Sequence, residues 1–288
     1  MNALLYYCSL PWIYLVSFLP FPLLYVLSDG MRFFLFGLIG YRKKVVMTNL
    51  RNAFPEKEEA QIRAIAQEFY RFFCDLALET LKTLTISPAT LKKRVLFEDI
   101  SLFRRYYEQG KSVIVVMGHL GNWELGGARF ALEPVHPLYV IYHPLHNPYF
   151  DRLMYHMRTR LGNRLYAMKE TVRGMFENRE QATATAFIAD QTPSPKQAYW
   201  TSFLNQETPV FTGTGRIATK FNYPILYVSV WQVRRGYYRI ESEELGGNPG
   251  EKTEKEIFEL HTRRLEADIR LRPAYWLWTH RRWKHKRA

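Results

Sequence analysis

The sequence predicts an α/β protein with a mostly parallel central sheet flanked by helices, preceded by an N-terminal membrane-anchoring helix. From residue 94 onward, short apolar runs alternate with amphipathic stretches, the order expected of a parallel sheet with crossover helices. Residues 113–117 are apolar throughout, as expected for a strand buried on both faces. Residues 10–27 carry no charge, and about 18 uncharged apolar residues can span a bilayer.

The apolar N-terminus has the features of a retained anchor. Pro11, Pro20 and Pro22 interrupt it, so we expect a kinked or re-entrant segment rather than one straight helix. It lacks the basic leading region and the small-residue cleavage site of a signal peptide. A second apolar piece, residues 31–40, is too short to span a bilayer and is expected to lie in the interface.

Basic residues after the anchor predict its orientation. Arg32 and the basic run at residues 42–44 follow the apolar stretch. By the positive-inside rule, the bulk of the protein then faces the cytoplasm. We therefore divide the chain into a membrane anchor, residues 1–40, and a globular domain, residues 41–288. The alternative is that the N-terminus forms an internal core hairpin of a soluble protein.

The remaining elements follow from apolar periodicity and from Gly and Pro at their ends. We expect helices at residues 41–54, 56–84, 101–109, 123–132, 148–161, 169–178 and 252–272. We expect strands at residues 95–97, 113–117, 136–142, 164–167, 182–189, 225–233 and 237–243. Residues 194–208 are rich in Pro and polar side chains and predict a loop over the face of the sheet.

A histidine follows the most apolar strand. The run at 113–117 stops at Gly118, His119 comes next, and Asn122 is a good N-cap for the helix that follows. Open α/β sheets carry their sites at the carboxyl ends of strands. Glu124 is the acid close by in this stretch. Its carboxylate can hold one imidazole nitrogen protonated, so that the other nitrogen takes a proton from a hydroxyl. The alternative is a buried histidine satisfied by a neighbouring carboxylate.

Residues 118–124, Gly-His-Leu-Gly-Asn-Trp-Glu, resemble the His-x4-Asp/Glu block of the bacterial lipid A biosynthesis late acyltransferases. This lauroyl/myristoyl acyltransferase family belongs to a wider superfamily with the glycerolipid and lysophospholipid acyltransferases. Residues 142–148 resemble the family's Arg-Pro-x-x-Asn-Pro block, with His143 where the family usually has Arg. Asp190-Gln191 resembles its Asp-Gln block. Residues 276–284 resemble its Trp-x-x-His-Arg-Arg-Trp signature, and residues 49–55 its Asn-Leu-x-x-Ala-Phe-Pro segment.

The resemblance implies an acyltransferase at the bacterial inner membrane, with its catalytic domain on the cytoplasmic side. The donor would be the thioester of an acyl carrier protein, and the acceptor a hydroxyl of a lipid A precursor. No cofactor or metal is implied beyond the acyl thioester. His119 would be the general base and Glu124 would orient it. Further residues are predicted to bind substrate: Asn122, Arg158, Arg160, Asp190, Gln191 and Arg216.

Charge and composition point to an anionic partner. The formal net charge is +13 and the isoelectric point about 9.7, which suits phospholipid headgroups, a phosphorylated glycolipid, nucleic acid or an acidic carrier protein. The basic tail carries Trp276, Trp278 and Trp283, and indoles are common at membrane interfaces. Because no RNA- or DNA-binding module signature accompanies the tail, we do not expect a nucleic-acid partner.

Other reaction classes lack their sequence marks. The spacing of Cys and His does not match a zinc site, and the Gly-x-Gly at residues 213–215 matches neither a dinucleotide fingerprint nor a P-loop. A Gly-x-Ser-x-Gly elbow is absent, so the transfer is expected to be direct, without an acyl-enzyme. Two alternatives stay open: an acyl-CoA-dependent acyltransferase acting on another membrane lipid, and a non-catalytic membrane protein that binds anionic lipid.

Overall fold

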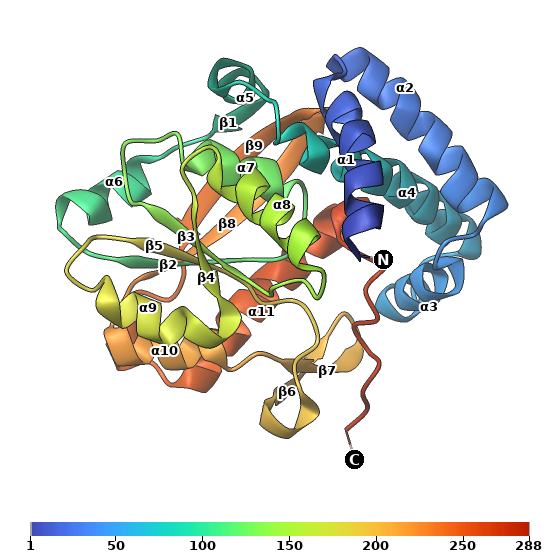
Figure 1. The fold of residues 1–288 in the computed structure, drawn as a ribbon. Helices are drawn as coiled ribbons and strands as arrows, with labels where there is room; N and C mark the ends of the chain where they lie inside the picture. The colour runs from blue at the N-terminus through green and yellow to red at the C-terminus, as the bar shows by residue number, and fades with distance from the viewer. Residues whose placement is uncertain (1, 288) are drawn as a thin grey trace.

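A seven-stranded sheet forms the centre of the computed structural model, which describes residues 2–287 (Figure 1). The strand order is β1-β9-β8-β2-β5-β3-β4. All neighbours are parallel except β8 and β9, which form a hairpin, so the predicted mostly parallel α/β sheet is confirmed. The strands are β1 (Val95–Phe97), β2 (Val113–Met117), β3 (Leu138–Tyr142), β4 (Arg164–Ala167), β5 (Ala184–Ile188), β8 (Ile225–Arg234) and β9 (Tyr237–Glu244).

Helices cover both faces of this sheet (Figure 1). The side chains of β2 alternate between two hydrophobic cores, with Ile114 in the core on one face and Val115 in the core on the other. The first core includes residues of α9 (Thr171–Glu177), α10 (Gly213–Phe221) and α11 (Glu254–Leu271), and the second includes residues of α5 (Pro88–Arg94), α6 (Ser101–Glu108) and α7 (Trp123–Phe130). This two-sided burial explains why the β2 sequence is apolar at every position.

A helical layer stands beside the sheet. It consists of α1 (Asn2–Phe18), α2 (Phe21–Arg32), the π-helical turn η1 (Phe33–Leu38), α3 (Lys43–Ala53) and the long helix α4 (Glu59–Lys82). Helix α8 (Pro148–Thr159) lies close to α1. Lys82 links the end of α4 to the C-terminal end of α1, because its ammonium donates to the carbonyls of Ser17 and Leu19 at 2.6 and 2.8 Å.

The N-terminal segment is divided differently from the prediction. The uncharged stretch 10–27 is broken at Pro20, which precedes the first residue of α2. Among the described residues, only Phe21–Leu38 is a helix long and apolar enough to cross a membrane, by length and composition. Residues 31–38 continue this helix instead of forming a separate interfacial piece. The boundary at residue 40 between anchor and domain stays a prediction.

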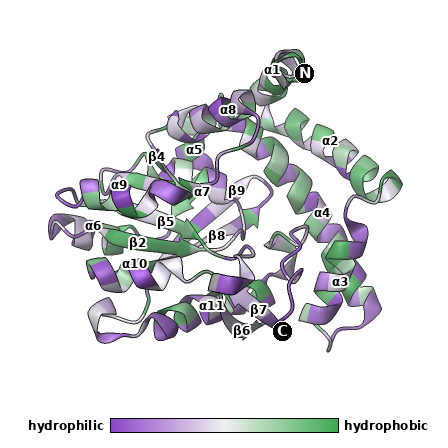
Figure 2. Ribbon diagram, turned by 60° about the horizontal axis from the view of Figure 1, so that its bottom comes forward, coloured by the Kyte–Doolittle hydropathy of each residue, from purple (hydrophilic) through white to green (hydrophobic). Residues whose placement is uncertain are grey.

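The outer sides of α1, α2 and η1 are apolar and exposed (Figure 2). Large hydrophobic side chains there are between 41% and 70% exposed: Leu4, Leu5, Tyr7, Trp12, Leu15, Phe18, Leu23, Val26, Leu27, Phe33, Phe34, Leu38 and Ile39. An exposed apolar surface of this extent is typical of a protein or membrane contact.

Two further elements differ from the prediction. The predicted loop at 194–208 holds a hairpin of β6 (Tyr199–Phe203) and β7 (Gln206–Val210). Its two turn residues, Leu204 and Asn205, both have positive φ, as a tight hairpin turn requires. Helix α5 was not predicted, although Ser87 caps it by accepting from the backbone N–H of Thr90 at 3.1 Å.

Candidate active site

His119 and Asp190 meet because β2 and β5 are neighbouring parallel strands. Met117, the last residue of β2, is paired with Ile188, the last residue of β5. His119 and Asp190 each come two residues later, at the same carboxyl edge of the sheet. The ring Nδ1 of His119 lies 2.5 Å from Oδ1 of Asp190, and the backbone N–H of His119 donates to Oδ2 at 2.7 Å.

Asp190 is buried and ionised. Burial by itself raises the pKa of its carboxyl, but electrostatic attraction to the His119 ring and hydrogen bonds from His119 and Trp276 outweigh it and bring the pKa to about 2. The indole Nε1 of Trp276 donates to Oδ2 at 2.7 Å. Arg282 is almost fully buried nearby, where burial lowers its pKa to about 10 and the charge of Asp190 opposes that change.

The predicted contact between Glu124 and the imidazole ring is wrong. Glu124 lies in the first turn of α7 and accepts two hydrogen bonds from Arg158 of α8, from Nε at 3.1 Å and from Nη2 at 2.6 Å. Burial lowers the pKa of the Arg158 guanidinium, but Glu124 more than compensates, so the net effect is a raised pKa. The turn before α7 carries Glu124 toward α8, whereas the ring of His119 faces β5.

The second ring nitrogen of His119, Nε2, does not contact Asp190 and has Gln191 as its neighbour. Because an ionised carboxylate can only accept, the proton between the two groups is on Nδ1 of His119. The amide nitrogen of Gln191 lies 3.3 Å from Nε2, and the ring of Trp123 packs edge-to-face against the imidazole, with centroids 4.8 Å apart. The predicted site residues His119, Gln191, Arg158 and Glu124 therefore line one space.

That space is an apolar cavity of about 410 Å³ between α7, α8 and the sheet. Its polar end holds His119, Glu124 and Arg158. The rest is mainly hydrophobic and includes Val115, Met117, Phe130, Leu138, Val140, Ile141, Met154, Ala186, Ile188, Val228, Val230 and Ile240. A cavity of a few hundred Å³ with apolar walls and a few convergent polar groups is typical of a ligand site.

Asp190, predicted to bind substrate, is instead the buried partner of His119, and three other predicted substrate-binding residues lie away from the cavity. Asn122 is fully buried, its Oδ1 accepting from Leu125 N–H and its Nδ2 donating to Glu79 at 2.7 Å. Arg160 donates to the carbonyls of Thr83 at 2.9 Å and Ile86 at 2.5 Å, just past the end of α4. These residues support the fold, and neither lines the cavity.

Arg216 is likewise absent from the cavity. It is exposed on α10, with its Nε 3.4 Å from Glu254.

The C-terminal signature, residues 276–284, packs directly against the loop that carries His119. The N–H of Leu277 donates to the carbonyl of His119 at 3.1 Å, and Trp276 forms an isolated antiparallel β-bridge with Leu120. Trp276 and Trp278 are at most 2% exposed, so the prediction that they contact the membrane is wrong. Asn49 reaches across from α3 and donates to the carbonyls of Trp278 and His280 at 3.0 and 3.1 Å. No local sequence pattern predicts this contact, because Asn49 and Trp278 lie 229 positions apart in the chain.

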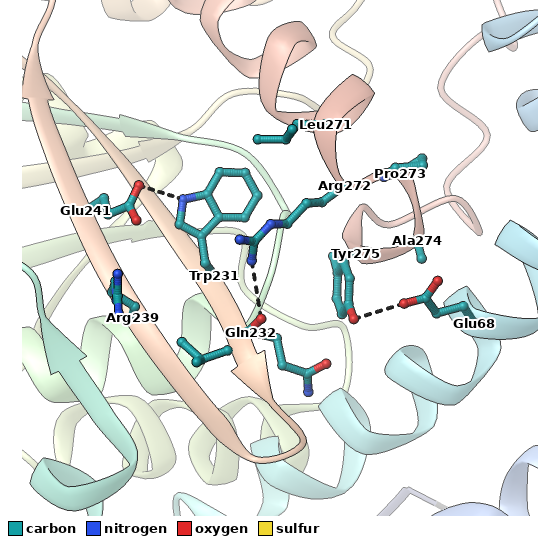
Figure 3. A pocket seen from close by; sticks show the side chains of 11 residues that line it. Glu68, Trp231, Gln232, Arg239, Glu241, Leu271, Arg272, Pro273, Ala274 and Tyr275 are labelled. Carbon is teal, nitrogen blue, oxygen red and sulfur yellow. Dashed lines mark hydrogen bonds between the residues drawn. The ribbon is translucent and has the colours of Figure 1, made fainter.

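A second depression, of about 520 Å³, lies on the other side of β8 (Figure 3). Its polar groups pair with one another. Trp231 donates to Glu241 at 2.9 Å, Tyr275 donates to Glu68 at 3.0 Å, and Arg272 donates to the carbonyl of Gln232. These satisfied pairs leave His119 and its cavity as the stronger candidate for chemistry.

The fold and the site together define an α/β protein with a hydrogen-bonded His119–Asp190 pair beside an apolar cavity. The chain belongs to the bacterial lipid A biosynthesis acyltransferase family, whose model matches residues 3–285. The family resemblance drawn from the sequence is thereby confirmed, and the protein is an acyltransferase.

Curated relatives are distant but cover most of the chain. The lipid A biosynthesis palmitoleoyltransferase of Escherichia coli K12 is 23% identical over 92% of this chain and 86% of its own length. The lipid A biosynthesis lauroyltransferase of the same organism is 22% identical over 94% of this chain and 89% of its own length. The lipid A biosynthesis myristoyltransferase matches 61% of this chain at 22% identity. The relatives' names differ in the acyl group.

Proposed function

We propose that this protein transfers a fatty acyl chain from the thioester of an acyl carrier protein to a hydroxyl of a lipid A precursor. The family and the names of its relatives support the acceptor. One observation supports the chemistry: His119, whose Nδ1 is fixed by Asp190, lines the 410 Å³ apolar cavity.

In the proposed step, Nε2 of His119 takes the proton of the acceptor hydroxyl as its oxygen attacks the thioester carbon. The carbon–oxygen bond forms, the carbon–sulfur bond breaks, and the imidazolium returns its proton to the thiolate. Asp190 fixes the tautomer and stabilises the transient positive charge. General base catalysis of this kind typically contributes 10²–10⁴-fold in rate.

Arg158 is the proposed donor to the tetrahedral oxyanion. Glu124 occupies Nε and Nη2, which leaves Nη1 available to a bound substrate. Glu124 thus acts as a positioning residue that holds the guanidinium beside the cavity. Removing one oxyanion donor typically costs about 10²–10³ in kcat.

The apolar part of the cavity is the proposed place for the acyl chain. Burying a methylene group gains about 0.8 kcal/mol, so a chain of a dozen or so carbons binds strongly there without specific polar contacts. Met154 and Ile240 are among its walls.

The exposed apolar helices support membrane binding. The segment Phe21–Leu38 and the outer side of α1 offer the hydrophobic surface, and basic residues at 42–44 follow at once. This order favours an inner-membrane protein whose catalytic domain lies on the cytoplasmic side, where acyl carrier protein is found.

The test is transfer by the detergent-purified protein from acyl carrier protein thioester to a lipid A precursor, with acyl-CoA as a second donor. The His119→Ala variant should lose at least about 10²-fold in transfer rate while still binding membranes. Transfer at the wild-type rate would refute the catalytic role. Mass spectrometry of lipids from cells without the protein tests the acceptor, and an unchanged acyl count on lipid A would rule it out.

A further inference from the structure

A basic groove runs between α3, β7 and the C-terminal segment. It has a volume of about 660 Å³. We call it the basic groove, and its lining residues are Lys44, Val45, Thr48, Asn49, Asn52, Gln206, Glu207, Arg281, Trp283, Lys284, His285, Lys286 and Arg287. Glu207 is its acidic residue, and it is already paired with Arg287 at 3.2 Å.

The other cations of the basic groove are not neutralised. Among residues 2–287, Lys44, Arg281, Lys284 and Lys286 form no ion pair. In the depression of Figure 3, by contrast, the acids accept hydrogen bonds from neighbouring side chains. Positive charges that converge on a groove without partners favour an anion with several oxygens, as phosphate has.

From these charges and their place, we propose that the basic groove binds the phosphate groups of the acceptor lipid's headgroup. This inference rests on the proposed function, in which the acceptor is a phosphorylated glycolipid. Phosphate recognition by the groove would hold the sugar in register while a hydroxyl reaches His119.

The basic groove lies close to both the membrane helices and the catalytic residue. Lys44 comes six residues after Leu38, the exposed last residue of η1. On the other wall, Arg281 follows Leu277, whose N–H donates to the His119 carbonyl, by only four residues. Four residues span at most about 14 Å, so a headgroup can occupy the groove while its acyl-accepting hydroxyl lies at the site.

Size favours a headgroup over an acidic protein. A volume of about 660 Å³ lies within the range of about 300–1,000 Å³ that is typical of small-ligand sites. A folded acidic protein could lie across the rim but could not enter. Neutral polar side chains, Thr48 and Asn52, also line the groove and suit sugar hydroxyls.

The test is a double charge reversal, Lys284→Glu with Lys286→Glu, in the full-length protein. Both side chains are exposed, so folding should be preserved. We expect the KM for the phosphorylated acceptor to rise at least about tenfold, with little change for the dephosphorylated acceptor or for the acyl carrier protein thioester. A rise in the donor KM alone would assign the surface to the carrier protein and overturn the proposal.

A matched control and a binding arm complete the design. Lys92→Glu with Lys93→Glu reverses two exposed charges on α5, outside the basic groove, and should leave the acceptor KM unchanged. In the second arm, His119→Ala protein sediments with phosphatidylcholine vesicles that contain the phosphorylated glycolipid or its dephosphorylated form. Preference for the phosphorylated form should vanish in the groove variant but not in the control. An equal preference for the phosphorylated vesicles in the groove variant and in the control variant would refute phosphate binding by the basic groove. Failure of the wild-type protein to transfer an acyl chain would refute only the proposed acyltransfer function.

Discussion

At the scale of single residues, the two acids near His119 have different tasks. Asp190 fixes the ring from Nδ1, whereas Glu124 fixes Arg158 on the next helix. The nearest acid in the sequence is therefore not the partner of the ring. Parallel β2 and β5 place two residues 71 positions apart in direct contact, while the turn at Asn122 carries Glu124 away.

The substitutions Asp190→Asn and Glu124→Gln separate these tasks. Asn at 190 can no longer fix the Nδ1–H tautomer by charge, so kcat should fall by about 10²–10⁴-fold with KM little changed. Gln at 124 leaves the base intact but loosens Arg158, so a smaller fall of about 10–10²-fold is expected. Steady-state kinetics on both variants provides the measurement. A larger loss from Glu124→Gln than from Asp190→Asn would reverse the two roles.

At the scale of elements, local sequence signals predict most strands and helices within a few residues. The apolar run of β2, the hairpin of β8 and β9, and the Gly and Pro punctuation all act locally. The order of the strands in the sheet has no such local signal, because it depends on where each crossover connection places the next strand. The sequence predicts that His119 and Asp190 each follow a strand, but only the order β8-β2-β5-β3 makes them neighbours. The tail was mispredicted for the same reason, since its indoles are buried by contacts with distant segments.

The turn between β2 and α7 depends on a glycine. Gly121 has φ +65°, and a Cβ at this position would lie 1.6 Å from the backbone oxygen of Val230. The loop that carries His119 lies directly against the β8 backbone at this glycine. On the C-terminal segment, the carbonyl of Tyr275 accepts a hydrogen bond from Gly121 N–H at 2.9 Å. A side chain at position 121 would have to displace the backbone of Val230, which cannot move aside by changing rotamer as a side chain can.

The substitution Gly121→Ala should therefore destabilise strongly, by more than about 3 kcal/mol, and abolish transfer. Gly110→Ala is the matched control. Gly110 has φ +67° but nothing within 4 Å of its added Cβ, so only the backbone cost of about 1 kcal/mol applies. Thermal unfolding in detergent compares the two variants. Equal losses of stability would mean that backbone conformation, and not the contact with Val230, sets the requirement.

At the scale of the whole molecule, a buried carboxyl joins the N-terminal helices to the active site. Glu79 of α4 accepts from Tyr25 of α2 at 2.7 Å, from Tyr238 of β9 at 2.6 Å and from Asn122 at 2.7 Å. Asn122 is the N-cap of α7, so α2, the sheet and the turn after His119 share one acid. Burial raises the pKa of Glu79 to about 7, although the three hydrogen bonds oppose the change.

This raised pKa makes stability depend on pH in a defined direction. A carboxyl with a folded pKa of about 7 and an unfolded value of 4.5 binds more protons when folded, so its contribution is complete below pH 4.5 and is lost as pH rises through 7. The gap between the two values corresponds to about 3 kcal/mol at 1.36 kcal/mol per pH unit.

The substitution Glu79→Gln removes this titration. We expect the variant to gain stability relative to wild type, by up to about 3 kcal/mol, when both are moved from pH 4.5 to pH 8. Denaturant unfolding in detergent at the two pH values measures it. A difference between variant and wild type that is the same at both would mean that Glu79 stays in one protonation state throughout, and that the link between anchor and active site is insensitive to pH.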